Sequence, residues 1–288
     1  MNQPVLITGC SSGIGLATAR YLAERGVPVI ATVRTEADAA RLAAIEGVDP
    51  VICDVTDDAH VARLREAIDA RGDGLWGLVH NAGIIHLGPL TTTPLEDVRA
   101  VFEVNVFGVH RVTNALADLI VASRGRIVTM SSIAGTLSSA LLATYAMSKH
   151  ALEAYTDGLA KQLAPHGVHV CAVAPGNFDS AIERNAAARF EAPAEASPDL
   201  AAWYGPDGDT SRTMYPPPEP VAAACHAALF DEAPLERYMV VPNAEEADLT
   251  LRQAAHEWAR LNASTPHRWA TERLVAQVVH TLDGSGTA

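Results

Sequence analysis

The chain has 288 residues, 49% of them hydrophobic and 19% charged, which is typical of a globular protein and excludes a disordered one. Its formal net charge of −13 argues against nucleic acid or an anionic membrane as the main partner. No apolar run approaches the roughly 18 residues that span a bilayer, and no basic segment precedes an apolar one at the N-terminus, so we expect neither a membrane span nor a signal peptide.

The four cysteines are scattered through the chain without C-x-x-C spacing. This pattern predicts reduced, buried thiols in a cytoplasmic protein at Cys10, Cys53, Cys171 and Cys225. The eleven histidines contain no H-x-x-x-H pair, so we expect no metal site.

Short β-branched runs alternate with longer helical patterns along most of the chain, which is typical of βαβ units and a parallel sheet. Strands are expected at residues 5–8, 29–32, 51–53, 77–80, 125–130, 168–173 and 238–241. Helices are expected at 13–25, 37–46, 58–71, 94–124 (one helix, or two joined near Asn105), 144–165 and 220–230. The strands are apolar on both faces, which predicts an α/β, Rossmann-like, doubly wound sheet with helices on each side. We expect a single domain over residues 1–288.

Two segments depart from this alternation. Residues 177–218 directly follow a strand and contain several prolines and aromatic residues, so we interpret them as a substrate lid, with a disordered surface loop as the alternative. Residues 245–282 read as a helical extension whose apolar side chains are available for burial. This extension is expected to close the substrate pocket or to form a subunit contact.

The sequence Thr8-Gly-Cys-Ser-Ser-Gly-Ile-Gly15 follows the first strand and opens the first helix. Glycine permits close backbone approach, and a helix N-terminus supplies N–H donors with a favourable dipole. This turn therefore predicts a dinucleotide site in which the pyrophosphate contacts Gly9, Ser11, Ser12, Gly13, Ile14 and Gly15.

The end of the second strand bears on the choice of cofactor. An acidic residue there would bind the ribose 2′-hydroxyl, but the strand ends in Arg34, whose guanidinium can pair with a 2′-phosphate. We therefore favour NADP(H) over NAD(H). The nearby Glu36 and Asp38 weaken this preference, and Arg34 has the alternative of stacking on adenine or pointing to solvent.

The ends of the third and fourth strands complete the expected cofactor site. Asp54, followed by Val55, is placed to accept a bond from the adenine amino group, or to cap the next helix. Asn81, Ala82 and Gly83 end the fourth strand, where small residues let the adenosine half lie against the backbone.

Tyr145 and Lys149 form a Y-x-x-x-K pair, thirteen residues after Ser132. A tyrosine normally titrates near pH 10, so general acid/base chemistry requires a stabilised phenolate. A lysine four residues further along a helix lies on the same face and can supply that charge. Ser132 can bond the substrate oxygen, and Asn105 can hold a water that links Lys149 to solvent.

Together these motifs, with Pro175-Gly176 after the sixth strand, resemble the short-chain dehydrogenase/reductase family from about residue 3 to residue 180. The resemblance implies a seven-stranded parallel sheet, a homodimer or homotetramer, and an Asn105-Ser132-Tyr145-Lys149 tetrad in which Lys149 also contacts the nicotinamide ribose. It further implies a nicotinamide loop formed by Pro175, Gly176, Phe178 and Ser180, with the Phe178 backbone at the carboxamide. Two residues depart from the family pattern, Ser180 for Thr and His80 for Asn.

The expected function is NADP(H)-dependent interconversion of a carbonyl and an alcohol on a hydrophobic small molecule, by hydride transfer with tyrosine as general acid/base. Three alternatives stay open: an NAD(H)-dependent alcohol dehydrogenase, a non-catalytic nicotinamide-binding sensor, and nucleotide-sugar epimerase or dehydratase chemistry.

Overall fold

The computed structural model describes residues 3–180, 182 and 215–282. Its contacts divide the chain into two compact units, Met1–Glu246 and Ala247–Ala288, and each is described by itself. Most of the lid expected at 177–218 lies outside the described residues.

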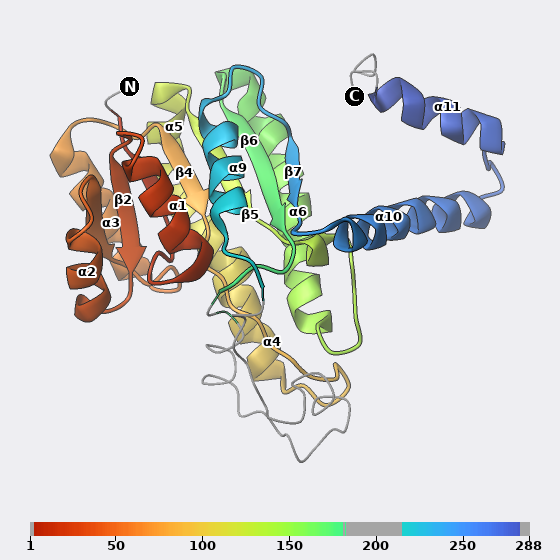
Figure 1. Ribbon diagram of the computed structural model, residues 1–288, viewed down its shortest axis with the longest axis horizontal. Coiled ribbons are helices and arrows are strands. Elements are labelled where there is room, and N and C mark those ends of the chain that lie inside the picture. The colour runs from red at the N-terminus through yellow and green to blue at the C-terminus, as the bar shows by residue number, and fades with distance from the viewer. Residues whose placement is uncertain (1–2, 181, 183–214, 283–288) are drawn as a thin grey trace. The chain divides into compact units, whose positions relative to one another are not determined.

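A seven-stranded parallel sheet forms the centre of the first unit (Figure 1). Its strand order is β3-β2-β1-β4-β5-β6-β7, so the chain winds outward from β1 in one direction and then from β4 in the other. The strands are β1 (Val5–Ile7), β2 (Val29–Val33), β3 (Val48–Ile52), β4 (Gly77–His80), β5 (Arg126–Met130), β6 (His169–Pro175) and β7 (Arg237–Val240). This order confirms the predicted doubly wound, Rossmann-like fold.

Strand bounds differ from the prediction most clearly at β3. This strand begins at Val48 instead of residue 51 and includes Pro50. Proline has no N–H for a ladder bond and is uncommon within strands, so Val48–Pro50 does not stand out as part of a strand in the sequence. The structure accommodates Pro50 because β3 is an edge strand, where a missing donor is tolerated.

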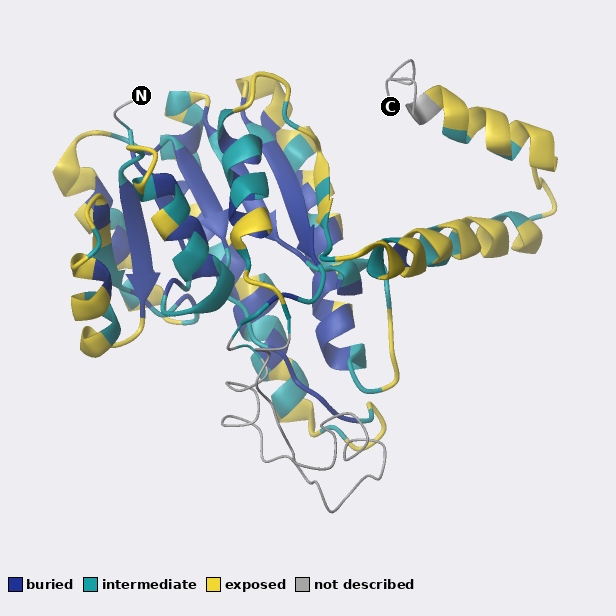
Figure 2. Ribbon diagram, viewed as in Figure 1, coloured by how far each residue is buried: buried dark blue, intermediate teal, exposed yellow. Residues whose placement is uncertain are grey.

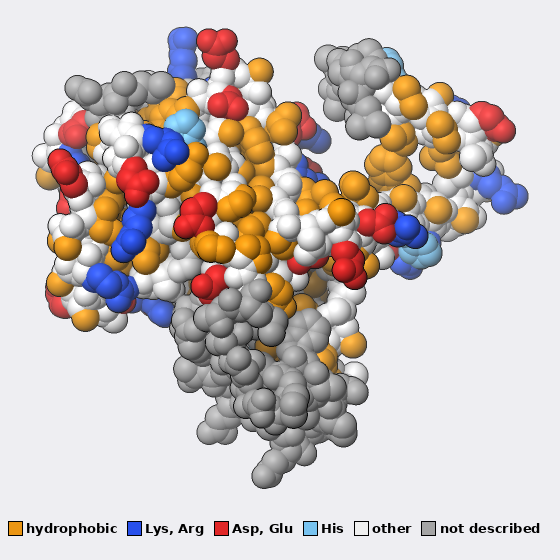
Figure 3. Space-filling model, viewed as in Figure 1, with side chains coloured by type: hydrophobic (Ala, Val, Ile, Leu, Met, Phe, Trp, Pro, Cys, Tyr) orange, Lys and Arg blue, Asp and Glu red, His pale blue; other side chains and the backbone are white. Residues whose placement is uncertain are grey.

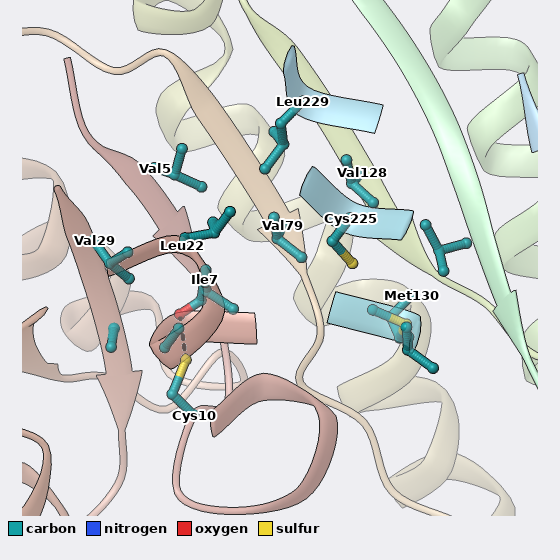
Figure 4. Close-up of a cluster of buried hydrophobic side chains, with 14 of the residues drawn as sticks. Val5, Ile7, Cys10, Leu22, Val29, Val79, Val128, Met130, Cys225 and Leu229 are labelled. Atoms are coloured by element: carbon teal, nitrogen blue, oxygen red, sulfur yellow. Dashed lines mark hydrogen bonds between the residues drawn. The ribbon is translucent and has the colours of Figure 1, made fainter. Parts of the chain in front are cut away.

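Helices cover both faces of the sheet, and each face has its own apolar core (Figure 2). Alternate residues of β1 point to opposite faces: Val5 and Ile7 enter one core and Leu6 the other. Figure 4 shows the first core, where Leu22 and Leu229 pack with Val5 and Val79. The first core is covered by α1 (Gly13–Ala23), α2 (Glu36–Ala43) and α9 (Glu219–Phe230), and the second by α3 (Asp58–Arg71), α5 (Gly108–Ser123) and α6 (Ala143–Leu163).

The segment expected to be helical over 94–124 contains a short π-helix. Helix α4 (Leu95–Phe102) leads into π-helical Glu103–Phe107, and α5 follows without a break. Asn105 lies in the middle of this π-segment and is almost completely buried. π-turns are rare and are frequent at functional sites.

The second unit is helical, as the sequence predicts. Helix α10 (Ala244–Ser264) begins in the first unit, and α11 (Thr271–Leu282) follows a connection in which the Asn262 side chain bonds both the backbone N–H and the carbonyl of Trp269. Several of the large apolar side chains that the sequence marks as available for burial are exposed, and Figure 3 shows hydrophobic side chains on the surface of these helices. They include Leu249, Leu251, Trp258 and Leu261.

All four cysteines are free and buried. Among the described residues, no helix combines the length and the apolar character needed to cross a membrane.

Candidate active site

The predicted cofactor and catalytic residues gather at the carboxyl ends of β1, β4, β5 and β6. Each of these strands is followed within one or two residues by a predicted site residue: Gly9, Asn81, Ser132 and Gly176. The strands are parallel, so their carboxyl ends share one edge of the sheet, which is where open α/β sheets bind ligands.

The glycine-rich turn after β1 is bonded to the segment after β4. The hydroxyl of buried Thr8 accepts the backbone N–H groups of Asn81 and Ala82, both at 3.0 Å. In return the Asn81 side-chain amide donates to the Thr8 and Gly9 carbonyls, both at 2.9 Å. These bonds fix the turn relative to the next strand without using a charged group.

Two glycines make this close contact possible. Gly9 has a φ of +72°, and a Cβ there would lie 2.8 Å from the Ala82 Cα. A Cβ on Gly15 would lie 2.3 Å from the Asn81 side-chain nitrogen. Any side chain at either position would push the two segments apart. The turn therefore offers bare backbone, which is what a pyrophosphate requires.

The start of α1 completes the fit to a dinucleotide. Ser12 is the N-cap residue, and its side chain makes no capping bond to the helix. The first N–H groups of a helix have no partner within the helix and attract anions. Ile14 packs against the core and fixes the helix on the sheet, while Ser11 remains partly accessible.

Two guanidinium groups lie near the end of β2. Arg34 directly follows the strand and is exposed. Arg41, on α2, donates to the Ser11 carbonyl in the glycine turn and pairs with Asp38 at 2.7 Å. Arg41 was not predicted from the sequence because it lies eight residues after the end of β2, on α2. The bond to Ser11 becomes visible only once α2 is placed beside the turn.

Asp54 has a local role that the sequence left open. Its carboxylate accepts from the Thr56 backbone and hydroxyl at 2.9 and 2.7 Å, whereas α3 is capped by Asp57, which accepts from the His60 N–H. The capping alternative for Asp54 is therefore wrong. Burial opposes ionisation of Asp54, but the Thr56 bonds and the charge of Arg34 outweigh it and hold its pKa below the usual value. Val55 beside it is buried in the second core.

Tyr145 and Lys149 come together on α6. The Lys149 Nζ lies 5.4 Å from the centroid of the Tyr145 ring and donates to the Met130 carbonyl at 2.7 Å. Lys149 is only 4% exposed and Tyr145 only 9%. Burial lowers the pKa of Lys149 from 10.5 to about 8, and the nearby Glu153 carboxylate opposes that shift.

Asn105 holds the segment after β4 against α6. Its amide nitrogen donates to the Ile84 carbonyl at 2.8 Å and to the Ser148 hydroxyl at 2.9 Å, and its oxygen accepts the Ile84 N–H at 2.8 Å. A Cβ on Gly83 would lie 3.4 Å from the Asn105 oxygen and 3.8 Å from the Lys149 Nζ. Gly83 thus lies close to both groups, which places them in one site.

Ser132 lies between the ends of β5 and β6. Its hydroxyl caps a short 3₁₀ turn by accepting the Ala134 N–H at 3.1 Å, and it approaches the Pro175 carbonyl at 3.4 Å. Beyond Pro175, the Phe178 side chain is buried in the first core. Ser180 is partly exposed.

A buried carboxylate near Lys149 was also missed from sequence. Glu153 is 8% exposed, accepts from the Ser131 hydroxyl at 2.6 Å and pairs with Arg237 of β7. Its spacing of four residues from Lys149 is a signal that could have found it. Its partners come from two strands, and no local pattern could have identified them.

Comparisons with known proteins agree with this geometry. A family model described as short chain dehydrogenase matches residues 3–190. The chain is 40% identical to retinol dehydrogenase 16 of Rattus norvegicus, over 60% of this chain and 56% of that protein. It is 34% identical to the uncharacterized oxidoreductase YbbO of Escherichia coli K12, over 83% of this chain and 86% of that one.

A solved structure supports the same relationship. The gluconate 5-dehydrogenase of Burkholderia cenocepacia, in complex with NADP and tartrate, superposes with a TM-score of 0.71 at 25% identity, covering 86% of this chain and 96% of that one. The chain spans between 55 and 65% of the length of the first curated relatives it matches.

Proposed function

This chain belongs to the short-chain dehydrogenase/reductase family and is an oxidoreductase, and we propose that it interconverts a carbonyl and an alcohol on a hydrophobic small molecule with NADP(H). The observation that carries the proposal is the pairing of buried Lys149 with Tyr145 beside the glycine turn. Burial lowers the pKa of Lys149 to about 8. Groups that transfer protons in enzymes typically have a pKa close to the working pH, as this one does.

The proposed proton transfer uses groups of this chain. When bound, the nicotinamide supplies or accepts the hydride. In reduction, the Tyr145 hydroxyl donates its proton to the substrate oxygen. The Ser132 hydroxyl, which donates to the Pro175 carbonyl at 3.4 Å in this structure, turns to donate its hydrogen bond to the same substrate oxygen. The Lys149 ammonium lowers the free-energy cost of the resulting phenolate. An ammonium has three donors, so the bond to Met130 fixes Lys149 and leaves others for this work.

The hydrogen bonds of Asn105 limit what its side chain can hold. Both N–H groups of its amide are donated to protein acceptors, so its side chain has none left for a water. A water that links Lys149 to solvent would have to donate a hydrogen bond to the side-chain or the backbone carbonyl oxygen of Asn105. We propose that the side chain positions the Gly83–Ile84 backbone.

Two features support NADP(H) over NAD(H). Arg34 directly follows β2 and Arg41 binds the glycine turn at Ser11, so two positive charges are available for a 2′-phosphate. Asp38, one of the two acidic residues that weaken the preference, is paired with Arg41 and also accepts from the Thr35 hydroxyl. The gluconate 5-dehydrogenase structure holds NADP.

The surroundings of Tyr145 support a hydrophobic substrate. Tyr145 belongs to a separate apolar cluster with Ile85 and Leu87, and Leu141 and Leu142 pack against it. Apolar walls with few polar groups are typical of small-molecule sites. The similarity to a retinol dehydrogenase points in the same direction.

We also propose a homodimer or homotetramer, as the family resemblance implies. Met147 on α6 and Phe107 at the end of the π-segment are large apolar side chains that are exposed on the first unit. Size-exclusion chromatography with light scattering tests this, and a monomer at micromolar concentration contradicts it.

Fluorescence titration of the full chain with NADPH and NADH tests the cofactor proposal. We expect NADPH to bind about tenfold more tightly, a difference that Arg34→Ala reduces because it removes a charge-assisted contact. Arg20→Ala, an exposed change in the last turn of α1, is the matched control. Equal binding of both cofactors would favour the NAD(H)-dependent alternative, and binding of neither would overturn the proposed function.

A further inference from the structure

The first turn of α10 contacts the loop that follows β6. The Glu246 carboxylate accepts the Asn177 backbone N–H at 2.9 Å through one oxygen and the Asn177 side-chain amide at 3.1 Å through the other. The two residues are 69 positions apart and both belong to the first unit.

The orientation of Glu246 is unusual for its position in the helix. Asn243 accepts the Glu246 N–H at 2.9 Å, as an N-cap residue does for the third residue of a helix. A glutamate at that position ordinarily reaches back to the backbone of the cap residue. Here both carboxylate oxygens are directed to Asn177. The helix start therefore uses this side chain to hold another segment.

The loop is closely packed at this point. The Gly176 N–H donates to the Val240 carbonyl at 2.8 Å, at the end of β7. A Cβ on Gly176 would lie 2.1 Å from the Glu246 carboxylate and 3.0 Å from Val241. The loop thus runs against the end of β7 and the start of α10, with no room for a side chain between them. Its path depends on both elements.

We propose that Glu246 is a positioning residue for the nicotinamide end of the cofactor site. It holds Asn177, and through Asn177 the Pro175–Ser180 backbone, in the conformation that binds the cofactor. The inference rests on the proposed function, because the loop is a cofactor loop only if the chain binds a nicotinamide dinucleotide. It gives the start of the C-terminal extension a role inside the site.

The Glu246 carboxylate is expected to restrict the Pro175–Ser180 loop to one conformation. A carboxylate that accepts two N–H groups makes charge-assisted bonds, which are stronger than neutral ones. Removing it leaves the Asn177 N–H without this acceptor in a partly buried place, and the loop gains alternative conformations. Cofactor binding must then order the loop again, which weakens the binding.

Two measurements on the full-length protein test the proposal. The first is hydrogen exchange of the peptide covering 175–180, which reports the Asn177 N–H directly. The second is fluorescence titration with NADPH. The variants are Glu246→Ala and the matched control Glu245→Ala. The control removes the same charge from the same helical turn, but the Glu245 side chain that it removes is exposed.

For Glu246→Ala we expect roughly tenfold faster exchange in this peptide and about tenfold weaker NADPH binding, the effect of losing a hydrogen bond to a charged group. For Glu245→Ala we expect neither. Faster exchange with unchanged binding overturns the positioning role, and unchanged exchange overturns the contact itself. If the wild-type protein binds no nicotinamide cofactor, the proposed function fails, whereas the exchange data still decide whether the contact exists.

A second variant guards against a general loss of structure. Asn177→Ala removes the side-chain amide that binds one Glu246 oxygen and leaves the backbone N–H that binds the other. We expect its effect on NADPH binding to be smaller when Glu246→Ala is already present, because the side-chain bond is then already lost. Additive losses in the double variant contradict the proposal.

Discussion

The glycine turn and the catalytic helix α6 lie at the same edge of the sheet, but different interactions hold them in place. The turn is held against the segment after β4 by Thr8, Asn81 and glycine contacts that involve no charge, and Arg41 adds one charged contact at the Ser11 carbonyl. On α6, Lys149 and Glu153 are buried charged groups whose partners come from strands β5 and β7. The contact between the turn and the segment after β4 therefore depends on shape, whereas the catalytic end depends on buried charges and should respond to pH.

The largest effect expected at the catalytic end comes from Tyr145→Phe. We expect about a thousandfold loss of kcat/KM for alcohol oxidation or carbonyl reduction, because the general acid/base is removed. NADPH binding should be retained. Steady-state rates on a panel of alcohols and ketones, with titration of the cofactor, measure both. Tyr155→Phe removes a hydroxyl from the same helix and is the control. Turnover that survives Tyr145→Phe rules out the proposed mechanism.

The matching change at the cofactor end is Gly9→Ala. We expect it to lower the free energy of unfolding by about 3 kcal/mol, since the new Cβ meets Ala82 at a positive φ. The loss should be the same from acid to alkaline pH, as no charge is involved. Gly158→Ala, where a Cβ would meet nothing within 4 Å on helix α6, should instead stabilise by about 0.5–1 kcal/mol. Urea unfolding at several pH values would measure both, and a pH-dependent loss in Gly9→Ala would break the comparison.

A smaller effect is expected from Glu153→Gln. It tests the electrostatics of the site because the substitution removes a negative charge. Loss of this carboxylate makes proton release from the Tyr145–Lys149 pair easier, because an anion nearby favours the protonated pair. The rate of alcohol oxidation should therefore rise at a pH about 0.5 to 1 unit lower than in the wild type. The profile of kcat/KM against pH measures this shift.

The groups around Glu153 supply controls for that shift. Ser131, directly after β5, and Arg237 from β7 face it, and the exposed Asp157 lies 4.0 Å from Arg237. Ser131→Ala removes a bond without changing charge and should leave the profile in place. Arg237→Gln removes a positive charge and should move the profile to higher pH. A shift in the same direction for Glu153→Gln and Arg237→Gln would indicate a structural cause.

The smallest effect is expected from Arg41→Ala. NADPH should bind about fivefold more weakly and NADH unchanged, because the exposed guanidinium acts on the 2′-phosphate through solvent-screened charge. The effect should shrink as salt is raised, unlike that of Gly9→Ala. Titrations at low and high ionic strength would show this. An equal loss for NADH would mean that Arg41 supports the turn through Ser11 instead.

Most of the fold could be predicted because each element carries its own pattern. The α3 helix was predicted with the bounds that the structure shows, since Gly72 ends it in a left-handed conformation. Strand β3 was predicted too short because Pro50 interrupts the strand pattern in the sequence. Only the sheet order, in which β3 pairs with β2 alone, shows that the proline lies in an edge strand. For Trp258 and Leu261, which are exposed, the sequence predicts only that they are available for burial, because an amphipathic pattern does not say which surface would cover them.

The amino-acid sequence by itself determined the βαβ order and placed Gly9, Asn81, Ser132, Tyr145 and Lys149 at the ends of strands or on the helix that follows. These residues could be found because their chemistry depends on short spacings. Only the tertiary structure decided which groups surround them: Arg41 at Ser11, Arg237 at Glu153, and Glu246 at Asn177. Each of these contacts joins elements far apart in the chain, and their meeting is set by the packing of helices on the sheet, which no local pattern contains.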